Sequence, residues 1–354
     1  MGINLYGLSP QHLERLMSEW DEPPFRASQI SAWVHQRSEC DPFRMTDLPE
    51  DLRERLAAEF PPLPFKARKR LSAKDGSVKF VFSLPDDATV ETVYLPSRKR
   101  KTVCVSTQVG CPVGCPFCAS GAAGLYRNLS AGEVMAQIHA VFNAMGGRDA
   151  SWNLVFMGMG EPLLNETSLQ RSLDVIFSSK GLDLGSRRVT VSTAGVIPGI
   201  ERLGKRSPSP ELAISLHSAN DSTRDRLVPL NKKYPIAPLL RAAEDYAELA
   251  GTDAVTMEVL LLEGVNDDRR DAKALVELLR RRPFRVNVIR HNGVFNDDYR
   301  APSERVIQSF ADLLRSKGIE TSVRRSLGAE IHGGCGQLSP VPREDQALSH
   351  EDET

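Results

Sequence analysis

The sequence predicts an α/β protein: a partial (βα)6 barrel of the TIM type, preceded by a small N-terminal helical domain and a β-hairpin segment. Three observations predict this fold. Residues 1–60 carry apolar side chains at helical spacing. Residues 78–96 have the pattern of two strands around a turn. From residue 101 onward, short β-branched runs alternate with helical patterns, which is typical of a parallel sheet covered by helices.

The N-terminal segment is expected to form three helices. Residues 9–20 place apolar residues three and four positions apart after a Ser-Pro start. Residues 27–36 and 49–59 show the same periodicity, and the proline-rich stretch 60–65 has the composition of a linker.

A hairpin is expected next, and then the barrel. The hairpin strands are 78–84 and 88–96, around the turn residues Pro85, Asp86 and Asp87. The predicted barrel strands are 102–107, 153–157, 188–193, 212–216, 255–261 and 285–289. The predicted helices are 130–145, 168–179, 196–203, 235–250 and 268–281, with a further helix and strand at 303–317 and 320–324. In such a barrel the active site lies at the C-terminal ends of the strands.

The composition is that of an ordinary soluble protein. The 354 residues contain 45 Lys and Arg against 46 Asp and Glu, a net charge of −1, and 41% are hydrophobic. No apolar run reaches the roughly 18 residues of a membrane helix, and the first residues lack the pattern of a signal peptide. We therefore expect a cytoplasmic protein with no membrane partner.

The near-zero net charge hides a segregation of charge along the chain. Residues 1–60 hold six basic and eleven acidic residues, residues 61–108 hold ten and four, and the last 14 hold one and five. The basic excess lies at 66–70 and 98–101. Such runs are usually solvated faces, but a concentrated excess also suits phosphate binding. The changes in charge composition and in the pattern of predicted helices and strands suggest four parts: a helical accessory domain (1–60), a basic hairpin extension (61–100), the core (101–338) and a disordered acidic tail (339–354).

Four of the six cysteines fall in the segment CVSTQVGCPVGCPFC, directly after a predicted strand. Cys111, Cys115 and Cys118 have the spacing C-x3-C-x2-C. Three closely spaced thiolates suit an iron–sulfur cluster in which one iron lacks a protein ligand. A structural zinc site usually takes four ligands in two pairs, so zinc would need a histidine or Cys335 as the fourth ligand. Both interpretations remain open on spacing alone.

The CPVGCPFC motif at the end of a first barrel strand resembles the signature of the radical S-adenosylmethionine (SAM) superfamily. That resemblance implies a [4Fe–4S] cluster held by the three cysteines, with SAM on the open iron. Further motifs resemble the RlmN/Cfr family of RNA methyltransferases, over about residues 10–338. They are FRASQISAWV, FMGMGEPLLN, TVSTAG, AISLHSAND, PLNKKYPI and GGCGQL.

The resemblance implies a role for three further residues. Cys335 matches the cysteine that carries a methyl group from SAM, from which a 5′-deoxyadenosyl radical then removes hydrogen. Cys104 matches the cysteine that forms a disulfide with Cys335 and releases the product. Glu91 matches the base that removes the ring proton. From the residues alone, Cys335 could equally be a small buried thiol and Glu91 an exposed strand carboxylate. The glycines around Cys335 suggest a flexible segment.

The expected SAM-binding residues lie at or near the ends of predicted strands. They are Gly160, Glu161, Ser192, Ser215, Leu216, His217 and Asn292. The serines could instead satisfy local backbone groups, and His217 could be a packed histidine. Cys40 matches no family role. The sequence departs from the family where Gly333 and Gly334 replace expected alanines and in the loop 290–299 around Asn292.

The favoured interpretation is an enzyme that methylates carbon-2 of adenosine in 23S rRNA and in tRNA. A Cfr-like carbon-8 methyltransferase would use the same residues. Two other classes stay open: a zinc-stabilised RNA-binding protein without catalysis, and a radical SAM enzyme acting on a peptide. The resemblance also implies an external electron donor such as flavodoxin, and we expect a monomer.

Overall fold

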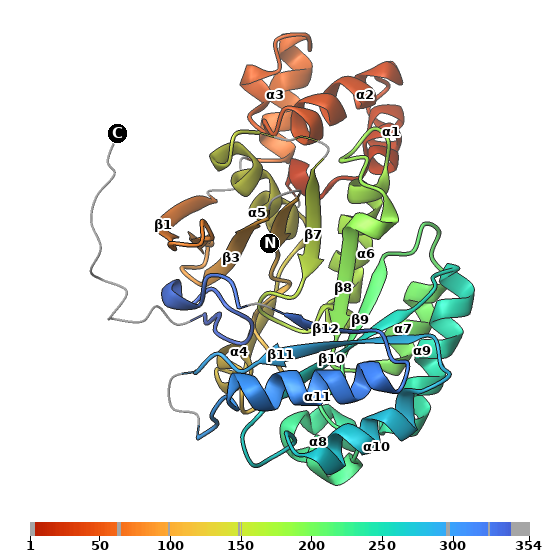
Figure 1. Ribbon diagram of the computed structural model, residues 1–354. Coiled ribbons are helices and arrows are strands. Elements are labelled where there is room, and N and C mark those ends of the chain that lie inside the picture. The colour runs from red at the N-terminus through yellow and green to blue at the C-terminus, as the bar shows by residue number, and fades with distance from the viewer. Residues whose placement is uncertain are drawn as a thin grey trace.

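A ten-stranded sheet runs through the molecule (Figure 1). The computed structural model describes residues 4–61, 65–97, 100–147, 149, 151–294, 298–324 and 326–340. The strand order is β1-β2-β3-β4-β7-β8-β9-β10-β11-β12, and β5 pairs separately with β6. Among the described helices, none is long and apolar enough to span a membrane.

The first part of the sheet is antiparallel. It consists of β1 (Lys66–Ser72), β2 (Val78–Ser83), β3 (Thr89–Pro96) and β4 (Lys101–Cys104). The predicted hairpin is confirmed, since β2 pairs with β3 across the expected turn. Strand β1 was not predicted, because its sequence KARKRLS is basic and lacks an apolar alternation. It lies at the edge of the sheet, where backbone pairing on one side is enough to hold a polar strand.

Seven parallel strands follow from β4 onward, as the partial barrel requires. The remaining six are β7 (Trp152–Phe156), β8 (Val189–Thr193), β9 (Glu211–Ser215), β10 (Val255–Leu261), β11 (Phe284–Arg290) and β12 (Thr321–Arg324). Every neighbouring pair from β4 to β12 is parallel, and β4 and β12 do not pair with each other in the described structure. Six crossovers and an open seam confirm the predicted α/β fold class.

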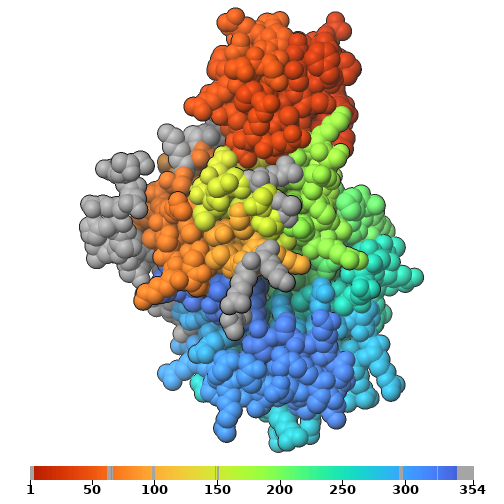
Figure 2. All heavy atoms as spheres, turned by 45° about the horizontal axis from the view of Figure 1, so that its top comes forward, coloured from red at the N-terminus to blue at the C-terminus, as the bar shows by residue number. Residues whose placement is uncertain are grey.

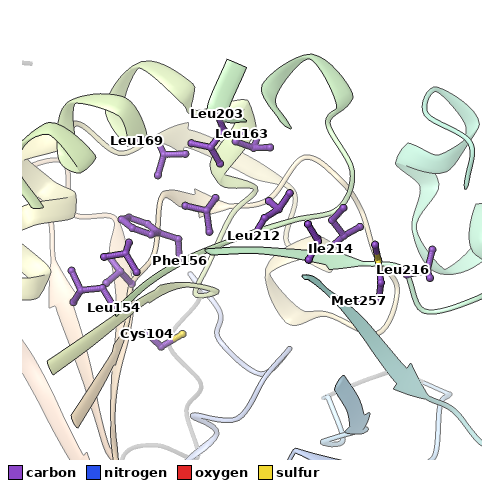
Figure 3. Close-up of a cluster of buried hydrophobic side chains, with 14 of the residues drawn as sticks. Cys104, Leu154, Phe156, Leu163, Leu169, Leu203, Leu212, Ile214, Leu216 and Met257 are labelled. Atoms are coloured by element: carbon purple, nitrogen blue, oxygen red, sulfur yellow. The ribbon is translucent and has the colours of Figure 1, made fainter. Parts of the chain in front are cut away.

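Helices cover the outer face of these strands (Figure 1). They are α5 (Ala131–Ala144), α6 (Glu166–Phe177), α7 (Ile197–Gly204), α9 (Ile236–Ala250), α10 (Arg269–Leu279) and α11 (Glu304–Ser316). The short helices α4 (Ala119–Ala122) and α8 (Asp221–Leu227) lie instead at the C-terminal ends of the strands. Helix α11 shows why they pack there: Ile307, Phe310, Ala311 and Leu314 form one buried stripe at helical spacing. Figure 3 shows the core that forms between these helices and the strands.

The segment after β4 differs most from the prediction. The expected strand 102–107 is shorter in the structure, and the chain continues into β5 (Gln108–Gly110), which pairs with β6 (Leu125–Asn128).

Helix α8 was also not predicted. Its sequence DSTRDRL buries only Arg224 and Leu227, so it gives too little apolar periodicity to recognise.

The N-terminal helices form a lobe that projects from the barrel (Figure 2). Helices α1 (Pro10–Glu19), α2 (Phe25–Ser31) and α3 (Glu50–Glu59) enclose their own apolar core, and a π-helical turn extends α2 to Gln36. The lobe docks on α5 through His139, whose ring stacks on Tyr6 at 4.7 Å between centroids. Cys40 lies in this lobe, where burial raises the pKa of its thiol.

Candidate active site

Polar side chains line the inner face of the open barrel. In register, Ser215 of β9 lies beside Glu258 of β10, and Glu258 lies beside Asn287 of β11. Register neighbours point to the same side of a sheet, so these three side chains form one layer. Ser192 of β8 is paired with Ala213, two residues before Ser215, and therefore faces the same interior. The structure thus places both predicted serines on the inner side of the barrel.

The carboxylate of Glu258 was not identified from the sequence. Its Oε1 accepts a hydrogen bond from Asn287 Nδ2 at 3.2 Å, whereas its Oε2 is buried and has no hydrogen-bond partner among the described residues. Burial raises the pKa of this carboxyl group, and Arg324 opposes that shift. A buried acceptor inside the barrel fits a ligand that carries N–H groups, as SAM and adenine both do. A lone acid within the apolar strand VTMEVLL was the signal that could have found it.

The three clustered cysteines lie on the loop that joins β5 to α4. The loop is held by hydrogen bonds from Cys111 N to Gly124 O at 2.9 Å and from Cys118 N to Cys115 O at 3.1 Å. Burial raises the pKa of Cys115 well above the usual thiol value, and the neighbouring Cys118 and Cys111 raise it further. The three thiols therefore interact with one another, and none is in a disulfide.

These thiols fit a [4Fe–4S] cluster. Each cysteine of such a cluster binds a different iron, so the sulfur atoms need not converge on one point. In the described part of the chain, no three His, Cys, Asp or Glu side chains are arranged to hold a single metal ion. The Cys loop also packs against apolar side chains that follow β8, β10 and β11, which places it over the ends of the barrel strands.

Gly160 and Glu161 follow β7 and connect two strand ends. The Glu161 carboxylate accepts hydrogen bonds from Ala194 N at 2.6 Å and Leu163 N at 3.0 Å. Burial nevertheless raises the pKa of Glu161 to about 7. Gly160 has φ of +99°, and a Cβ there would lie 2.6 Å from Gln108 Cβ. Only glycine therefore fits at this position.

Leu216 and His217 directly follow β9, where the backbone turns so that two successive N–H groups share one acceptor. Both backbone N–H groups donate to Glu258 O, at 3.0 and 3.1 Å. His217 Nδ1 accepts from Leu260 N at 3.1 Å, and the ring meets Phe117 of the Cys loop edge-on at 5.0 Å. Burial lowers the pKa of His217 to about 3, so the ring is neutral near pH 7. His217 thus braces the Cys loop against β10.

The segment that carries Cys335 is firmly attached to the barrel mouth. Ala119 N donates to Gly336 O at 2.8 Å, and Ser120 Oγ donates to Leu338 O at 2.6 Å. Asn292, a predicted SAM contact, donates from Nδ2 to Cys335 O at 3.2 Å. These bonds tie the segment to α4 and to the loop after β11.

The glycines beside Cys335 serve close packing in this structure. A Cβ on Gly334 would lie 2.7 Å from Asn292 Nδ2 and 2.8 Å from Gln337 Oε1. Gly333 packs against Val93 of β3, with 3.4 Å between an added Cβ and the valine Cγ1. In this structure the segment is held by these contacts and by its hydrogen bonds, and its flexibility stays a prediction.

Cys104 and Cys335 are brought together although 231 positions separate them in the sequence. Cys104 ends β4 at the edge of the apolar cluster in Figure 3, and Cys335 is solvent-accessible in the barrel mouth. Burial raises the pKa of Cys104 to about 12; Arg324 lowers it and Cys335 raises it. Solvent reaches Cys335 through the barrel mouth, but desolvation by the surrounding barrel atoms still raises the pKa of its thiol, again opposed by Arg324. Both are free thiols, and Arg324, at the end of β12, interacts with each.

Glu91 lies on β3 with only 3% of its surface exposed, so the interpretation as an exposed strand carboxylate is wrong. Its Oε1 is 2.9 Å from Lys79 Nζ, and its Oε2 accepts from Ser339 N at 3.0 Å. Lys79 also donates to His332 O at 3.4 Å. The ion pair therefore joins the hairpin to both flanks of the Cys335 segment. Lys79 was not recognised because a lysine in a strand ordinarily points to solvent.

An open parallel barrel with three free thiols on the loop after its first strand defines a radical SAM enzyme. The model of the radical SAM superfamily matches residues 105–279. The model described as the ribosomal RNA large subunit methyltransferase N-terminal domain matches residues 3–60. A crystal structure of a radical SAM methyltransferase from Sphaerobacter thermophilus superposes with a TM-score of 0.91 at 40% identity, covering 96% of this chain and 100% of that one.

Curated relatives identify the family. The chain is 42% identical to the probable dual-specificity RNA methyltransferase RlmN of Moorella thermoacetica, over 97% of this chain and 98% of the relative. It is 40% identical to the dual-specificity RNA methyltransferase RlmN of Anaeromyxobacter dehalogenans, over 95% and 91%. The chain belongs to the RlmN family of radical SAM RNA methyltransferases, whose cofactors are a [4Fe–4S] cluster and SAM.

Proposed function

We propose that this enzyme methylates carbon-2 of adenosine in 23S rRNA and in tRNA, with Cys335 as the methyl carrier. The observation that supports this most is the pairing of a solvent-accessible Cys335 with a buried Cys104 beside one guanidinium, that of Arg324. The Cys335 sulfur is open to a substrate in the barrel mouth. The Cys104 sulfur is buried, so it can approach the Cys335 sulfur only from within the protein. When bound, the cluster and SAM supply a methyl group and a 5′-deoxyadenosyl radical.

Each of the proposed catalytic residues then has a separate chemical role. The Cys335 sulfur accepts the methyl group as a thioether and presents it at the barrel mouth. Once one hydrogen atom has been removed from that methyl group, its carbon bonds to carbon-2 of the base, so that a methylene group links the RNA to Cys335. The adduct would return one electron to the oxidised cluster. Glu91 accepts the ring proton of the base, and Lys79 holds that carboxylate in place. The Cys104 sulfur attacks the Cys335 sulfur, so that an S–S bond replaces the bond from sulfur to the methylene carbon. The electron pair of the broken bond passes to that carbon, which takes a proton as the base leaves.

Cys111, Cys115 and Cys118 are proposed as the cluster ligands. The proposed SAM contacts are Gly160, Glu161, Ser192, Ser215, Leu216, His217 and Asn292. Glu258 adds an acceptor inside the same barrel.

RNA is proposed to bind along the hairpin extension. Arg68, Arg70 and Arg100 are exposed there, whereas Lys101 is paired with Asp149 at 2.6 Å. Residues 98 and 99 of the second basic run lie outside the described residues. Phosphate contacts of this kind make affinity depend on salt. The substitutions R68Q and R70Q should therefore weaken RNA binding and flatten its salt dependence in a filter-binding titration.

We also propose the four-part organisation, with an accessory domain at 1–60, a hairpin extension at 61–100, a core at 101–338 and an acidic tail beyond it. The tail from residue 341 onward lies outside the described residues. A flavodoxin-type protein is proposed as the electron donor and a monomer as the working form.

Anaerobic turnover with rRNA fragments and tRNA, followed by mass spectrometry of the nucleosides, tests the function. The expected product is 2-methyladenosine, and 8-methyladenosine as sole product would overturn the proposal. The substitution C104A should accumulate a covalent RNA–protein adduct, because the product can no longer be released, whereas C335A should form none. Equal adduct formation in both variants would contradict the two-cysteine scheme.

A further inference from the structure

Arg224 is a fully buried arginine beneath the Cys loop. It lies on α8, with 0% of its surface exposed. Its guanidinium donates to three backbone carbonyl oxygens of the strand ends: Ala194 O at 2.7 Å, Ser215 O at 3.0 Å and Leu216 O at 3.0 Å. A fourth bond goes to Asn231 Oδ1 at 2.6 Å. One side chain thus joins the C-terminal ends of β8 and β9, where the proposed SAM contacts lie.

The hydrogen-bond partners of Arg224 are all uncharged. Asp221 and Asp225 lie nearby, but their carboxylates accept from Asn231 Nδ2, at 2.9 and 2.7 Å. Among the described residues, no carboxylate forms an ion pair with this guanidinium. Burial lowers the pKa of Arg224 to about 10, and Cys115 is the strongest of the charge interactions that oppose the shift.

A buried charge is costly unless an opposite charge lies close by. Arg224 also lies beside the Cys loop, because Ala194, whose carbonyl oxygen it bonds, and Leu227 of α8 pack in one apolar cluster with Cys115. The protein therefore holds a desolvated cation next to one of the proposed cluster ligands. A cluster bound by three thiolates gains one further negative charge when it is reduced. A fixed cation at this place stabilises that more negative state.

We propose that Arg224 is a positioning residue that supplies the counter-charge to the Cys115 side of the cluster and fixes the Ala194 and Ser215 carbonyl groups at the SAM-binding strand ends. This inference rests on the cluster and SAM of the family, and it is independent of the RNA and of the adenine carbon that is methylated. Arginine suits both tasks, since its planar fork can bond several acceptors at once. Lysine would keep the charge but not the fork.

The test uses two substitutions at this position and a matched control. R224M removes both the positive charge and the guanidinium group that bonds the carbonyl oxygens. R224K keeps the positive charge but lacks the planar guanidinium group. R226M removes a charge from the exposed Arg226 on the same helix and serves as the control. The measurements are iron content, the midpoint potential of the reconstituted cluster by EPR-monitored redox titration with dithionite, and the dissociation constant of SAM.

The two tasks of Arg224 separate in these measurements. At an effective dielectric of about 20, removing a unit charge near the cluster is expected to change the reduction equilibrium by about tenfold. R224M should therefore make reduction about tenfold less favourable, a shift of ~59 mV to lower potential. R224K should restore the potential but still bind SAM about tenfold more weakly, because the strand ends lose their bracing. R226M should change neither quantity.

Several outcomes would overturn the inference. A midpoint potential of R224M equal to that of R226M would remove the counter-charge role. SAM binding by R224K equal to that of the unmodified enzyme would remove the positioning role. If R224M takes up no iron, R224K decides alone: an unchanged potential with weakened SAM binding supports the inference, and a lowered potential contradicts it. RNA methylation is not needed for any of these readouts, so they stand apart from the proposed function.

Discussion

Replacing Lys79 by methionine should destabilise the protein strongly, because it leaves Glu91 buried without its cation. The two charges are 2.9 Å apart, and their side chains are 0% and 4% exposed. Their attraction at an effective dielectric of about 20 is ~6 kcal/mol. Desolvation of the two ions offsets most of this, so the intact pair contributes little net stability. Removing only Lys79 keeps the desolvation of Glu91 and loses the attraction, which we expect to cost about 3–5 kcal/mol.

Urea unfolding of four proteins measures this effect: the unmodified chain, K79M, E91Q and the double variant. The double variant should be more stable than the sum of the single effects predicts, by about 2–3 kcal/mol, because no unpaired charge remains. K101M is the control, since it breaks the exposed pair with Asp149 and should cost at most about 1 kcal/mol. Additive effects of K79M and E91Q would refute the buried pair, as would a loss in K79M no larger than in K101M.

Two further predictions concern the barrel mouth. G160A should destabilise the protein by about 2 kcal/mol more than G146A, because both glycines have positive φ but only the first meets Gln108; equal losses in thermal unfolding would contradict the close approach. Burial lowers the pKa of His217 from the usual 6.5 to about 3, so the contribution of the neutral ring to stability is complete above about pH 6.5. This stability is lost as pH falls, by up to about 1.4 kcal/mol per pH unit. H217N, which tolerates the left-handed backbone, should lose less between about pH 7 and pH 5 in urea titrations, and an unchanged slope would exclude His217 as the cause.

The regular elements of the barrel were predictable because their patterns are local. Residues 255–261 form β10 with the predicted bounds, and the long helices begin and end within a few residues of the predicted ranges. Strand β1 and helix α8 were missed for one shared reason. Their residues are mostly charged, and they are held by pairing and hydrogen bonds with distant segments rather than by an apolar stripe.

Spacing and resemblance predicted Cys111, Cys115 and Cys118 as cluster ligands, because all three lie on one short loop. The contacts around Cys335 could not be predicted from the sequence. Asn292, Glu91 and Lys79 reach its segment from the loop after β11, from β3 and from β2. Arg324 became recognisable only when the register placed it on the inner face of the barrel, beside the layer that contains Glu258. The close packing of Gly333 and Gly334 could not be predicted from the sequence, because glycine permits close packing as readily as motion.

The sequence by itself determined the class of fold and the cluster motif, because periodicity and short-range spacing are properties of neighbouring residues. The tertiary structure alone decided which groups lie together: the buried pair Lys79 and Glu91, the buried Cys104 with the exposed Cys335 and Arg324, and the buried Arg224 beside the Cys loop. A charge or a thiol changes its behaviour through desolvation and through the charges around it. Both depend on segments that are distant in the chain and meet only when the sheet is assembled.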